Sequence, residues 1–319
     1  DLRFGYPAGG LRDAWATELK ALLEADAAIA QAVVDISWRI HSHKVQGELT
    51  PIPGVKNVLA VASGKGGVGK STTTANVALA LAAEGAKVGI LDADIYGPSI
   101  PRMMGLSGRP DIEGEAILPK VSHGVQTMSI GYLIEEDTPM VWRGPMVTQA
   151  LQQLLNETRW DDLDYLVIDL PPGTGDIQLT LSQRVPVSGA LIVTTPQDIA
   201  LLDARKGLKM FEKVGVPVLG IVENMSTHVC SNCGHEEPIF GTGGGEQMAA
   251  DYGVDLLGQI PLDIQIRMQA DGGIPTVAAA PESNLAEAYL SVARQAAARL
   301  SRQARSKKLQ FPNIKILDT

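Results

Sequence analysis

The residues from Gly64 to Thr72 combine glycines, lysines and a hydroxyl in the pattern of a phosphate-binding loop. They are Gly64-Lys65-Gly66-Gly67-Val68-Gly69-Lys70-Ser71-Thr72, and they lie between an apolar run at 58–63 and a helix-forming stretch. Glycines let consecutive backbone N–H groups surround an anion, and the following helix directs its positive dipole end at that anion. Lys70 is expected to reach the β- and γ-phosphates, and the Ser71 hydroxyl to ligate Mg²⁺. The pattern predicts a nucleotide site, with a plain glycine-rich turn as the alternative.

Three carboxylates end apolar runs that are typical of parallel strands. Asp169 closes the run 165–169 in the manner of a Walker B element, which predicts that it holds Mg²⁺ through water. Asp92 and Asp94 end another run, at 87–92. Because the carboxyl ends of parallel strands meet at one edge of a sheet, these side chains are expected to lie near the loop. Helix caps or surface ion pairs are the alternative roles.

Lys65 is a second cation, which a generic phosphate-binding loop does not need. Directly after the first glycine, it is poorly placed for the phosphates of its own loop. Lys65 is therefore expected to serve the phosphates of a partner molecule, and a solvated surface lysine is the alternative.

The two cysteines of the chain, Cys230 and Cys233, form a Cys-x-x-Cys pair that aims two thiolates at one metal. A [4Fe–4S] cluster needs four cysteines, so a two-fold dimer would supply the second pair. The dimer required by this ligand count agrees with the one implied by Lys65. Two alternatives stay open: a Zn²⁺ site within one chain that adds His228 and His235, and a redox disulfide.

The loop that contains Lys65 resembles the deviant Walker A loop of an ATPase class that includes the Min and Par positioning proteins, the nitrogenase iron protein and the Mrp/ApbC iron–sulfur carriers. The order of motifs from about residue 50 to 300 resembles the Mrp/ApbC iron–sulfur cluster carrier family in particular. Besides the loop and the cysteines, the matching motifs are Asp94-Ile95-Tyr96-Gly97-Pro98-Ser99, Asp169-Leu170-Pro171-Pro172-Gly173-Thr174-Gly175-Asp176, Asn224-Met225-Ser226 and Ile239-Phe240-Gly241.

The resemblance implies roles for individual residues. Lys65 would cross a dimer to the other subunit's phosphates. Asp94 would orient or deprotonate the attacking water, with Asp92 in a supporting role. Gly173 would offer its N–H to the γ-phosphate, and Asn224 would bind adenine.

The function implied by the resemblance is that of an ATP-hydrolysing homodimer. It would accept a [4Fe–4S] cluster from a cluster donor and pass it to apo iron–sulfur proteins, with no membrane or nucleic acid as partner. The main alternative is a Min/Par-like positioning ATPase that acts on membrane or DNA, and the cysteine pair argues against it. An electron donor like the nitrogenase iron protein is a further alternative, although the cysteines of that protein lie far apart in sequence.

The fold class expected is α/β: a doubly wound, mostly parallel P-loop NTPase domain preceded by a partial small α+β domain. Apolar runs at 87–92, 165–169, 189–194, 216–224 and 255–260 predict strands buried on both faces. A helix is predicted at 281–301 and another at 11–25, and alternating residues at 32–41 predict a half-buried strand. The expected limits are 1–43 for the small domain, 44–57 for a linker, 58–303 for the ATPase domain and 304–319 for a tail.

Composition and charge narrow the class further. The chain has 319 residues and a net charge of −9, which does not favour non-specific binding to nucleic acid. Neither an apolar run of membrane-spanning length nor a secretion leader is recognised, so a cytoplasmic location is expected. His41 and His43 are expected to be solvated at a strand end.

Overall fold

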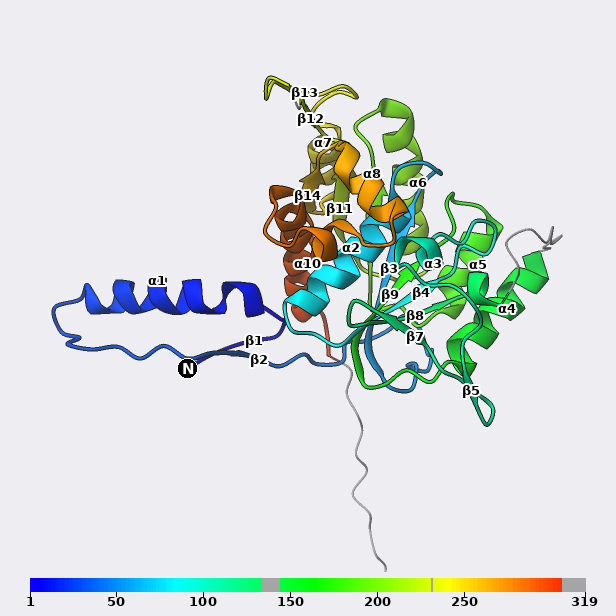
Figure 1. Cartoon of the computed structure of the whole chain (residues 1–319), viewed down its shortest axis with the longest axis horizontal. Coiled ribbons are helices and arrows are strands. Elements are labelled where there is room, and N and C mark those ends of the chain that lie inside the picture. The colour runs from blue at the N-terminus through cyan, green and yellow to red at the C-terminus, as the bar shows by residue number, and fades with distance from the viewer. Residues whose placement is uncertain (134–143, 231, 306–319) are drawn as a thin grey trace, which may run out of the picture.

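The structure, a computed structural model, describes residues 1–133, 144–230 and 232–305. An eight-stranded sheet forms its centre (Figure 1). In order across the sheet, the strands are β14 (Leu256–Ile260), β11 (Val218–Asn224), β10 (Gly189–Thr194), β3 (Val55–Ser63), β9 (Leu163–Asp169), β4 (Val88–Asp92), β8 (Val125–Ser129) and β7 (Lys120–Ser122). All neighbours pair in parallel except β7 and β8. The mostly parallel α/β P-loop fold predicted from the sequence is confirmed.

Helices cover both faces of the sheet, because its central strands carry apolar residues on both sides. One face packs against α2 (Lys70–Ala83), α3 (Ile100–Met103), α8 (Ile264–Asp271), α9 (Thr276–Ala279) and α10 (Asn284–Ser301). The other packs against α4 (Gly144–Glu157), α5 (Asp176–Arg184), α6 (Asp198–Lys213) and α7 (Gly244–Tyr252). The sheet thus lies between two hydrophobic cores.

The strand β3 begins earlier than the apolar run at 58–63. Val55 already pairs with Leu163 of β9, so β3 extends into the stretch 44–57 that was expected to be a linker. The domain limits expected from the sequence stay a prediction. Of the tail expected at 304–319, residues 306–319 lie outside the described part of the chain.

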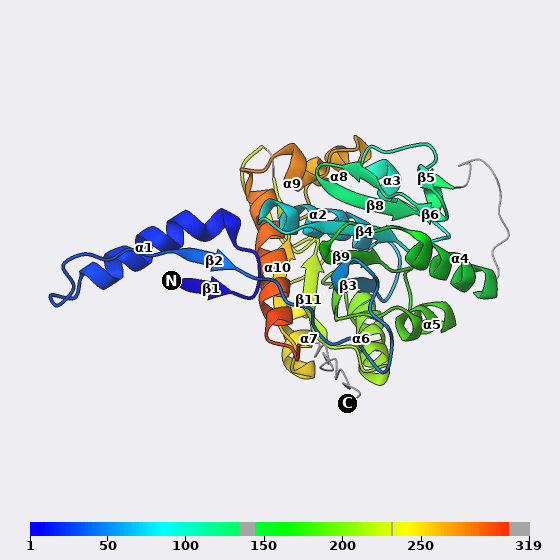
Figure 2. The same cartoon turned by 90° about the horizontal axis from the view of Figure 1, so that it is seen from below.

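The N-terminal residues form a separate arm that projects from the body (Figures 1 and 2). It consists of β1 (Leu2–Phe4), a 3₁₀ turn η1 (Gly9–Leu11), α1 (Arg12–Glu24) and β2 (Ile36–Trp38). The alternation at 32–41 becomes a strand at Ile36–Trp38 alone, because those residues pair with the short β1. The arm is anchored where the Gly9 N–H donates to the Glu84 carbonyl (3.0 Å) and the Gly10 N–H to the Glu84 carboxylate (2.9 Å).

Three smaller elements complete the description. A hairpin of β5 (Ile112–Glu113) and β6 (Ala116–Ile117) lies outside the main sheet, and a 3₁₀ turn η2 (Ile130–Tyr132) follows β8. A second hairpin, β12 (His228–Val229) with β13 (Glu236–Glu237), encloses the cysteine pair. Among the described residues, no helix is both long and apolar enough to span a bilayer.

Candidate functional site

The loop from Gly64 to Thr72 connects β3 to α2 at the carboxyl edge of the sheet. Gly69 begins α2 with a φ of 82°, a left-handed conformation that favours glycine. A Cβ atom there would also lie 2.1 Å from Nδ2 of Asn224. Gly69 is therefore required both by the turn and by the closeness of β11 to the loop.

Lys70 is the centre of a buried group of charges. Its Nζ donates to Oδ1 of Asp169 at 2.8 Å and to the Ser71 hydroxyl at 3.3 Å, and lies 3.7 Å from Oδ2 of Asp94. The Thr74 hydroxyl also donates to Oδ1 of Asp169, at 2.8 Å. The structure thus brings together Lys70, Ser71, Asp94 and Asp169, as the sequence predicted that they would lie.

The second oxygen of Asp169 marks a place for a cation. Oδ2 of Asp169 is buried and has no hydrogen-bond partner in the described part of the chain. A buried carboxylate oxygen without a partner is costly unless another group occupies the site. Carboxylate and hydroxyl oxygens are ligands that Mg²⁺ prefers, and the Ser71 hydroxyl and Asp169 share Lys70 Nζ as a hydrogen-bond partner. The residues present therefore fit Mg²⁺.

Asp92 is fully buried beside this group, directly opposite Asp169 in the β4–β9 register. Its carboxylate accepts hydrogen bonds from the Asp94 N–H (3.1 Å), the Ile100 N–H (3.2 Å) and the Ser129 hydroxyl (3.2 Å). Burial, followed by the charge of Asp169, raises the pKa of Asp92 to about 8. These contacts position the turn that carries Asp94, which fits the supporting role predicted for Asp92.

Asp94 differs from Asp92 because it is only partly buried and lies beside Lys70. Burial raises its pKa most, and Lys70 opposes that rise by favouring the charged form. A carboxylate with a raised pKa accepts a proton more readily than an ordinary one. Asp94 thus combines closeness to Lys70 with a raised pKa, and its predicted role toward a water molecule stays a prediction.

Two predicted residues are not in contact with this group. The Gly173 N–H donates to the carbonyl of Ser63 at 3.0 Å, so a contact with a γ-phosphate would require that bond to break. The Lys65 side chain is half-buried, and within the described residues it makes no ion pair or hydrogen bond.

A pocket of about 300 Å³ adjoins the loop and includes Asn224, the residue predicted to bind adenine. Asn224 ends β11 in this wall, and its side-chain amide donates to the Val68 carbonyl at 2.8 Å. The lining is mainly apolar, with a few polar groups, as is typical of pockets that bind small molecules. The residues that line it are Gly69, Thr72, Met103, Asn224, Met225, Pro261, Leu262, Asp263, Ile266, Arg267, Ala270 and Asp271. Of these, the sequence predicted a binding role only for Gly69, Thr72 and Asn224; Met225 belongs to a matching motif but was given no role, and the others lie outside the motifs.

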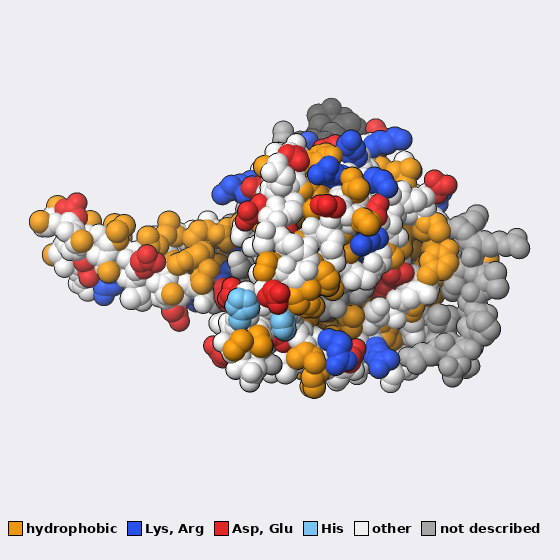
Figure 3. Space-filling model, turned by 90° about the horizontal axis from the view of Figure 1, so that it is seen from above, with side chains coloured by type: hydrophobic (Ala, Val, Ile, Leu, Met, Phe, Trp, Pro, Cys, Tyr) orange, Lys and Arg blue, Asp and Glu red, His pale blue; other side chains and the backbone are white. Residues whose placement is uncertain are grey.

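The cysteine hairpin leaves the same edge of the sheet, at the top of Figure 1. The Cys230 N–H donates to the His235 carbonyl at 2.9 Å, and the Gly234 N–H to the Cys230 carbonyl at 2.8 Å. Cys233 is exposed and Cys230 partly so. Hydrogen bonds from the backbone N–H groups of Asn232 and Cys233 lower the pKa of Cys230, which favours the metal-binding thiolate. Figure 3 looks onto this edge and shows charged side chains interspersed with apolar ones.

The histidines beside the cysteines do not complete a metal site within one chain. Nδ1 of His228 forms a hydrogen bond with the Leu262 carbonyl (3.1 Å), and His235 is exposed. In the described part of the chain, no group of three or more His, Cys, Asp or Glu side chains is arranged to hold a metal ion. Among the described residues, no third side chain of these types is therefore positioned beside the two thiols.

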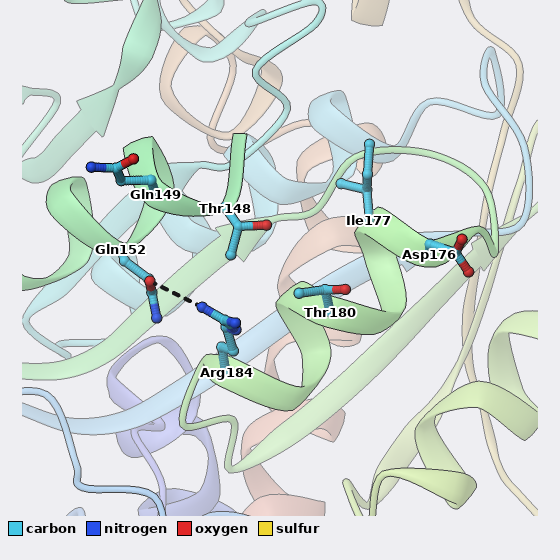
Figure 4. A pocket seen from close by; sticks show the side chains of 7 residues that line it. All are labelled: Thr148, Gln149, Gln152, Asp176, Ile177, Thr180 and Arg184. Carbon is cyan, nitrogen blue, oxygen red and sulfur yellow. Dashed lines mark hydrogen bonds between the residues drawn. The ribbon is translucent and has the colours of Figure 1, made fainter. Parts of the chain in front are cut away.

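A second pocket, of about 430 Å³, lies between α4 and α5 and is separate from the loop (Figure 4). Arg184 donates to Gln152 across it at 3.2 Å. None of the predicted site residues lines it, although Asp176, the last residue of the motif that begins at Asp169, does. The lining residues are Thr148, Gln149, Gln152, Asp176, Ile177, Thr180 and Arg184.

Solved structures share this fold. The nucleotide-binding protein in complex with ADP from Archaeoglobus fulgidus superposes with a TM-score of 0.62 at 40% identity, covering 69% of this chain and 87% of that one. The cell division ATPase MinD from Pyrococcus furiosus superposes with a TM-score of 0.56 at 27% identity, covering 75% of this chain and 97% of that one.

Sequence relatives are more similar still. The iron-sulfur cluster carrier protein of Escherichia coli (strain K12) is 59% identical over 290 residues, which cover 89% of this chain and 78% of that protein. The iron-sulfur cluster transfer protein NUBPL of Mus musculus is 53% identical over 253 residues, which cover 78% of this chain and 79% of that protein. The model of the ParA family described as NUBPL iron-transfer P-loop NTPase matches residues 54–297. The resemblance predicted from the motifs is therefore confirmed, and the chain belongs to the NUBPL iron-transfer P-loop NTPase family.

Proposed function

We propose that this chain is an ATP-hydrolysing carrier that holds a [4Fe–4S] cluster between two copies of itself and transfers it to apo-proteins. One observation carries the proposal: the buried group around Lys70 and the hairpin with both cysteines lie at the same edge of the sheet. The names of the sequence relatives support the same function.

The nucleotide half of the proposal follows from the charges around Lys70. ATP phosphates would replace Asp169 and Asp94 as partners of its ammonium group. Ser71 and Asp169 would hold Mg²⁺, which would neutralise charge on the β- and γ-phosphates. Asp94 would orient a water molecule and accept its proton as the water oxygen attacks the γ-phosphorus and the bond to the bridging oxygen breaks.

The carrier half follows from the ligand count. Each chain offers two thiols, and a [4Fe–4S] cluster takes four, so the cluster is expected to bridge two chains. The half-buried Lys65 side chain, which has no partner among the described residues, would meet the phosphates of the second subunit in the same dimer. A cluster donor would load the dimer in the cytoplasm, and apo iron–sulfur proteins would receive the cluster, without a role for membrane or nucleic acid.

The rival function, a positioning ATPase, shares the fold of MinD but gives the cysteine pair no role. MinD, the cell division ATPase of Pyrococcus furiosus, is also less similar in sequence to this chain, at 27% identity, than the carrier protein of Escherichia coli, at 59%. We therefore do not propose it.

A transfer assay tests the proposed function. After anaerobic reconstitution, the wild-type protein should activate an apo iron–sulfur enzyme, and Cys230→Ala should not, although both should bind ATP equally. Asn232→Ala is the matched control, because it keeps both thiols and the hydrogen bond from the backbone N–H of residue 232 to the Cys230 sulfur. Activation by Cys230→Ala at the wild-type level would remove the carrier function and leave the ATPase.

A further inference from the structure

The nucleotide pocket and the base of the cysteine hairpin share a wall. Leu262 lines the pocket next to Asn224 and Met225. Its backbone also anchors the hairpin, because the Leu262 N–H donates to the Thr227 carbonyl at 2.7 Å and the Leu262 carbonyl bonds Nδ1 of His228 at 3.1 Å. Since that carbonyl can only accept, the His228 ring nitrogen is the donor. Leu262 is therefore in contact with both sites.

Met225 adds strain at the point where the two sites meet. It has a φ of 58°, a left-handed conformation that is unfavourable for a side chain of this size. The residue before Met225 is Asn224, whose side-chain amide donates to the Val68 carbonyl. The residue after it is Ser226, whose N–H donates to the Ile260 carbonyl at 3.0 Å. Bonds on both sides thus hold the strained residue in place.

The other end of the hairpin returns to the same strand. The Glu223 carboxylate, buried beside Asn224, accepts from the Gly245 N–H at 2.6 Å and from the Gln259 amide at 2.7 Å. Gly245 lies in the first turn of α7, which begins seven residues after the end of β13. The segment that follows the hairpin is therefore bonded to the end of β11 that borders the pocket, as is the segment that precedes it.

We propose that Met225, His228 and Leu262 form a link through which a nucleotide in the pocket positions the cysteine pair. The proposal rests on the nucleotide site of the proposed function. A base that fills the pocket presses on the Leu262 and Met225 side chains and so fixes the anchor of β12. His228 is a positioning residue in this link, and its role is a hydrogen bond to the backbone rather than a contact with metal.

The link can be tested on the protein without a cluster, because Cys230 and Cys233 are its only cysteines. The rate at which a disulfide reagent modifies thiols therefore reports on this hairpin alone. Saturating Mg·ADP should slow modification of the wild-type protein at least about fivefold, the lower range for coupled sites. The slowing should not depend on protein concentration, because the link lies within one chain.

His228→Ala should reduce the effect of ADP to less than about twofold, since one anchor of the hairpin is lost. His235→Ala is the matched control: it removes the same side chain from the same hairpin, but that side chain makes no hydrogen bond among the described residues, so the full response should remain. ADP affinity is measured in parallel for each variant.

Met225→Gly provides an independent variant, because glycine accepts the left-handed conformation without strain. It should weaken the response while leaving the fold intact. Asp162→Gly, at another left-handed position (φ 47°) in an exposed turn, should keep it.

The outcomes separate the two proposals. A wild-type protein that does not bind ADP would remove the nucleotide site itself and the link with it. A protein that binds ADP without a change in thiol reactivity, or a full response in both His228→Ala and Met225→Gly, would overturn the link and leave the nucleotide site standing.

Discussion

In the described part of the chain, Lys70 is the one ammonium group that contacts the buried Asp169 and the partly buried Asp94. Asp92 lies beside them, opposite Asp169 in the sheet, and forms no ion pair with any described residue. A buried carboxylate in this position is more stable when it is protonated. The site is therefore built with an excess of negative charge, which a nucleotide-bound Mg²⁺ would balance.

Because the pKa of Asp92 is raised, we expect the free energy of unfolding to decrease as the pH rises. Its pKa is raised from 3.8 to about 8, so between these values the folded state keeps a proton that the unfolded state has released. The free energy of unfolding must then fall as the pH increases through this window. Asp92→Asn cannot ionise and should flatten that fall, as measured by urea unfolding without nucleotide between about pH 5 and 8.

The control for this experiment is Asp111→Asn, because Asp111 is an exposed aspartate that takes no part in the group around Lys70. It should keep the wild-type slope. An unchanged slope in Asp92→Asn would show that the Asp92 carboxyl is ionised in the folded protein across this range.

At the scale of elements, the loop is held in place by α6 as well as by β3 and α2. A Cβ atom on Gly64 would lie 2.2 Å from the carbonyl carbon of Asp203, in the backbone of α6. No side chain can be accommodated there without a movement of the helix. The glycines of the loop therefore differ in purpose, since a Cβ on Gly66 would meet nothing within 4 Å.

Gly64→Ala and Gly66→Ala should separate these purposes. Gly64→Ala should lower the free energy of unfolding by about 1–3 kcal/mol, because it overpacks the contact between the loop and α6. Gly66→Ala should change it by less than about 0.5 kcal/mol and yet weaken ATP binding, because a phosphate must approach that backbone closely. Urea unfolding and nucleotide titration of both variants provide the measurements. Equal stability losses would refute the distinction.

The sequence predicted those elements whose signal is local. The central strands were found because burial on both faces leaves continuous apolar runs, as at 189–194, where β10 has the predicted limits. The antiparallel edge of β7 and β8 was not predicted, since a short strand such as Lys120–Ser122 is defined by its partner. The strand predicted at 32–41 is shorter than expected, because β1 pairs only with Ile36–Trp38. Val33, outside that pairing, is 86% exposed.

The candidate site shows the same limit. Lys70, Asp94 and Asp169 could be placed together because each ends or begins an element at one edge of a parallel sheet. The hydrogen bond from Gly173 to Ser63 and the part of the pocket wall formed by Leu262 could not be predicted. Both depend on how loops that are far apart in sequence pack together.

At the scale of the whole molecule, each chain offers an incomplete set of groups for its proposed function. It has two thiols where a [4Fe–4S] cluster takes four, and a Lys65 side chain without a partner within the described residues. A second copy of the chain would supply the other two thiols and the phosphates for Lys65.

The N-terminal arm, by contrast, is fixed to the body of its own chain. Glu84 accepts from the Gly10 N–H of the arm, and the buried Glu84 carboxylate is itself held by Arg294 at 2.6 Å.

Mixed dimers test the role of Lys65. Lys65→Ala and Lys70→Ala should each lack ATP turnover, and an equimolar mixture should recover part of it, because one composite site then holds both native lysines. Phosphate release from the separate and mixed variants is the measurement, with heterodimers verified by differently tagged chains. Heterodimers without recovered turnover would indicate that Lys65 acts within its own chain.

The metal content of the reconstituted protein tests the central claim most directly. Iron, acid-labile sulfide and zinc are measured per chain after anaerobic reconstitution, for the wild-type protein and for Cys230→Ala. The predicted result is equal amounts of iron and sulfide, corresponding to one [4Fe–4S] cluster per two chains, and loss of both in Cys230→Ala. One zinc ion per chain without sulfide, lost on replacement of His228 or His235, would contradict it.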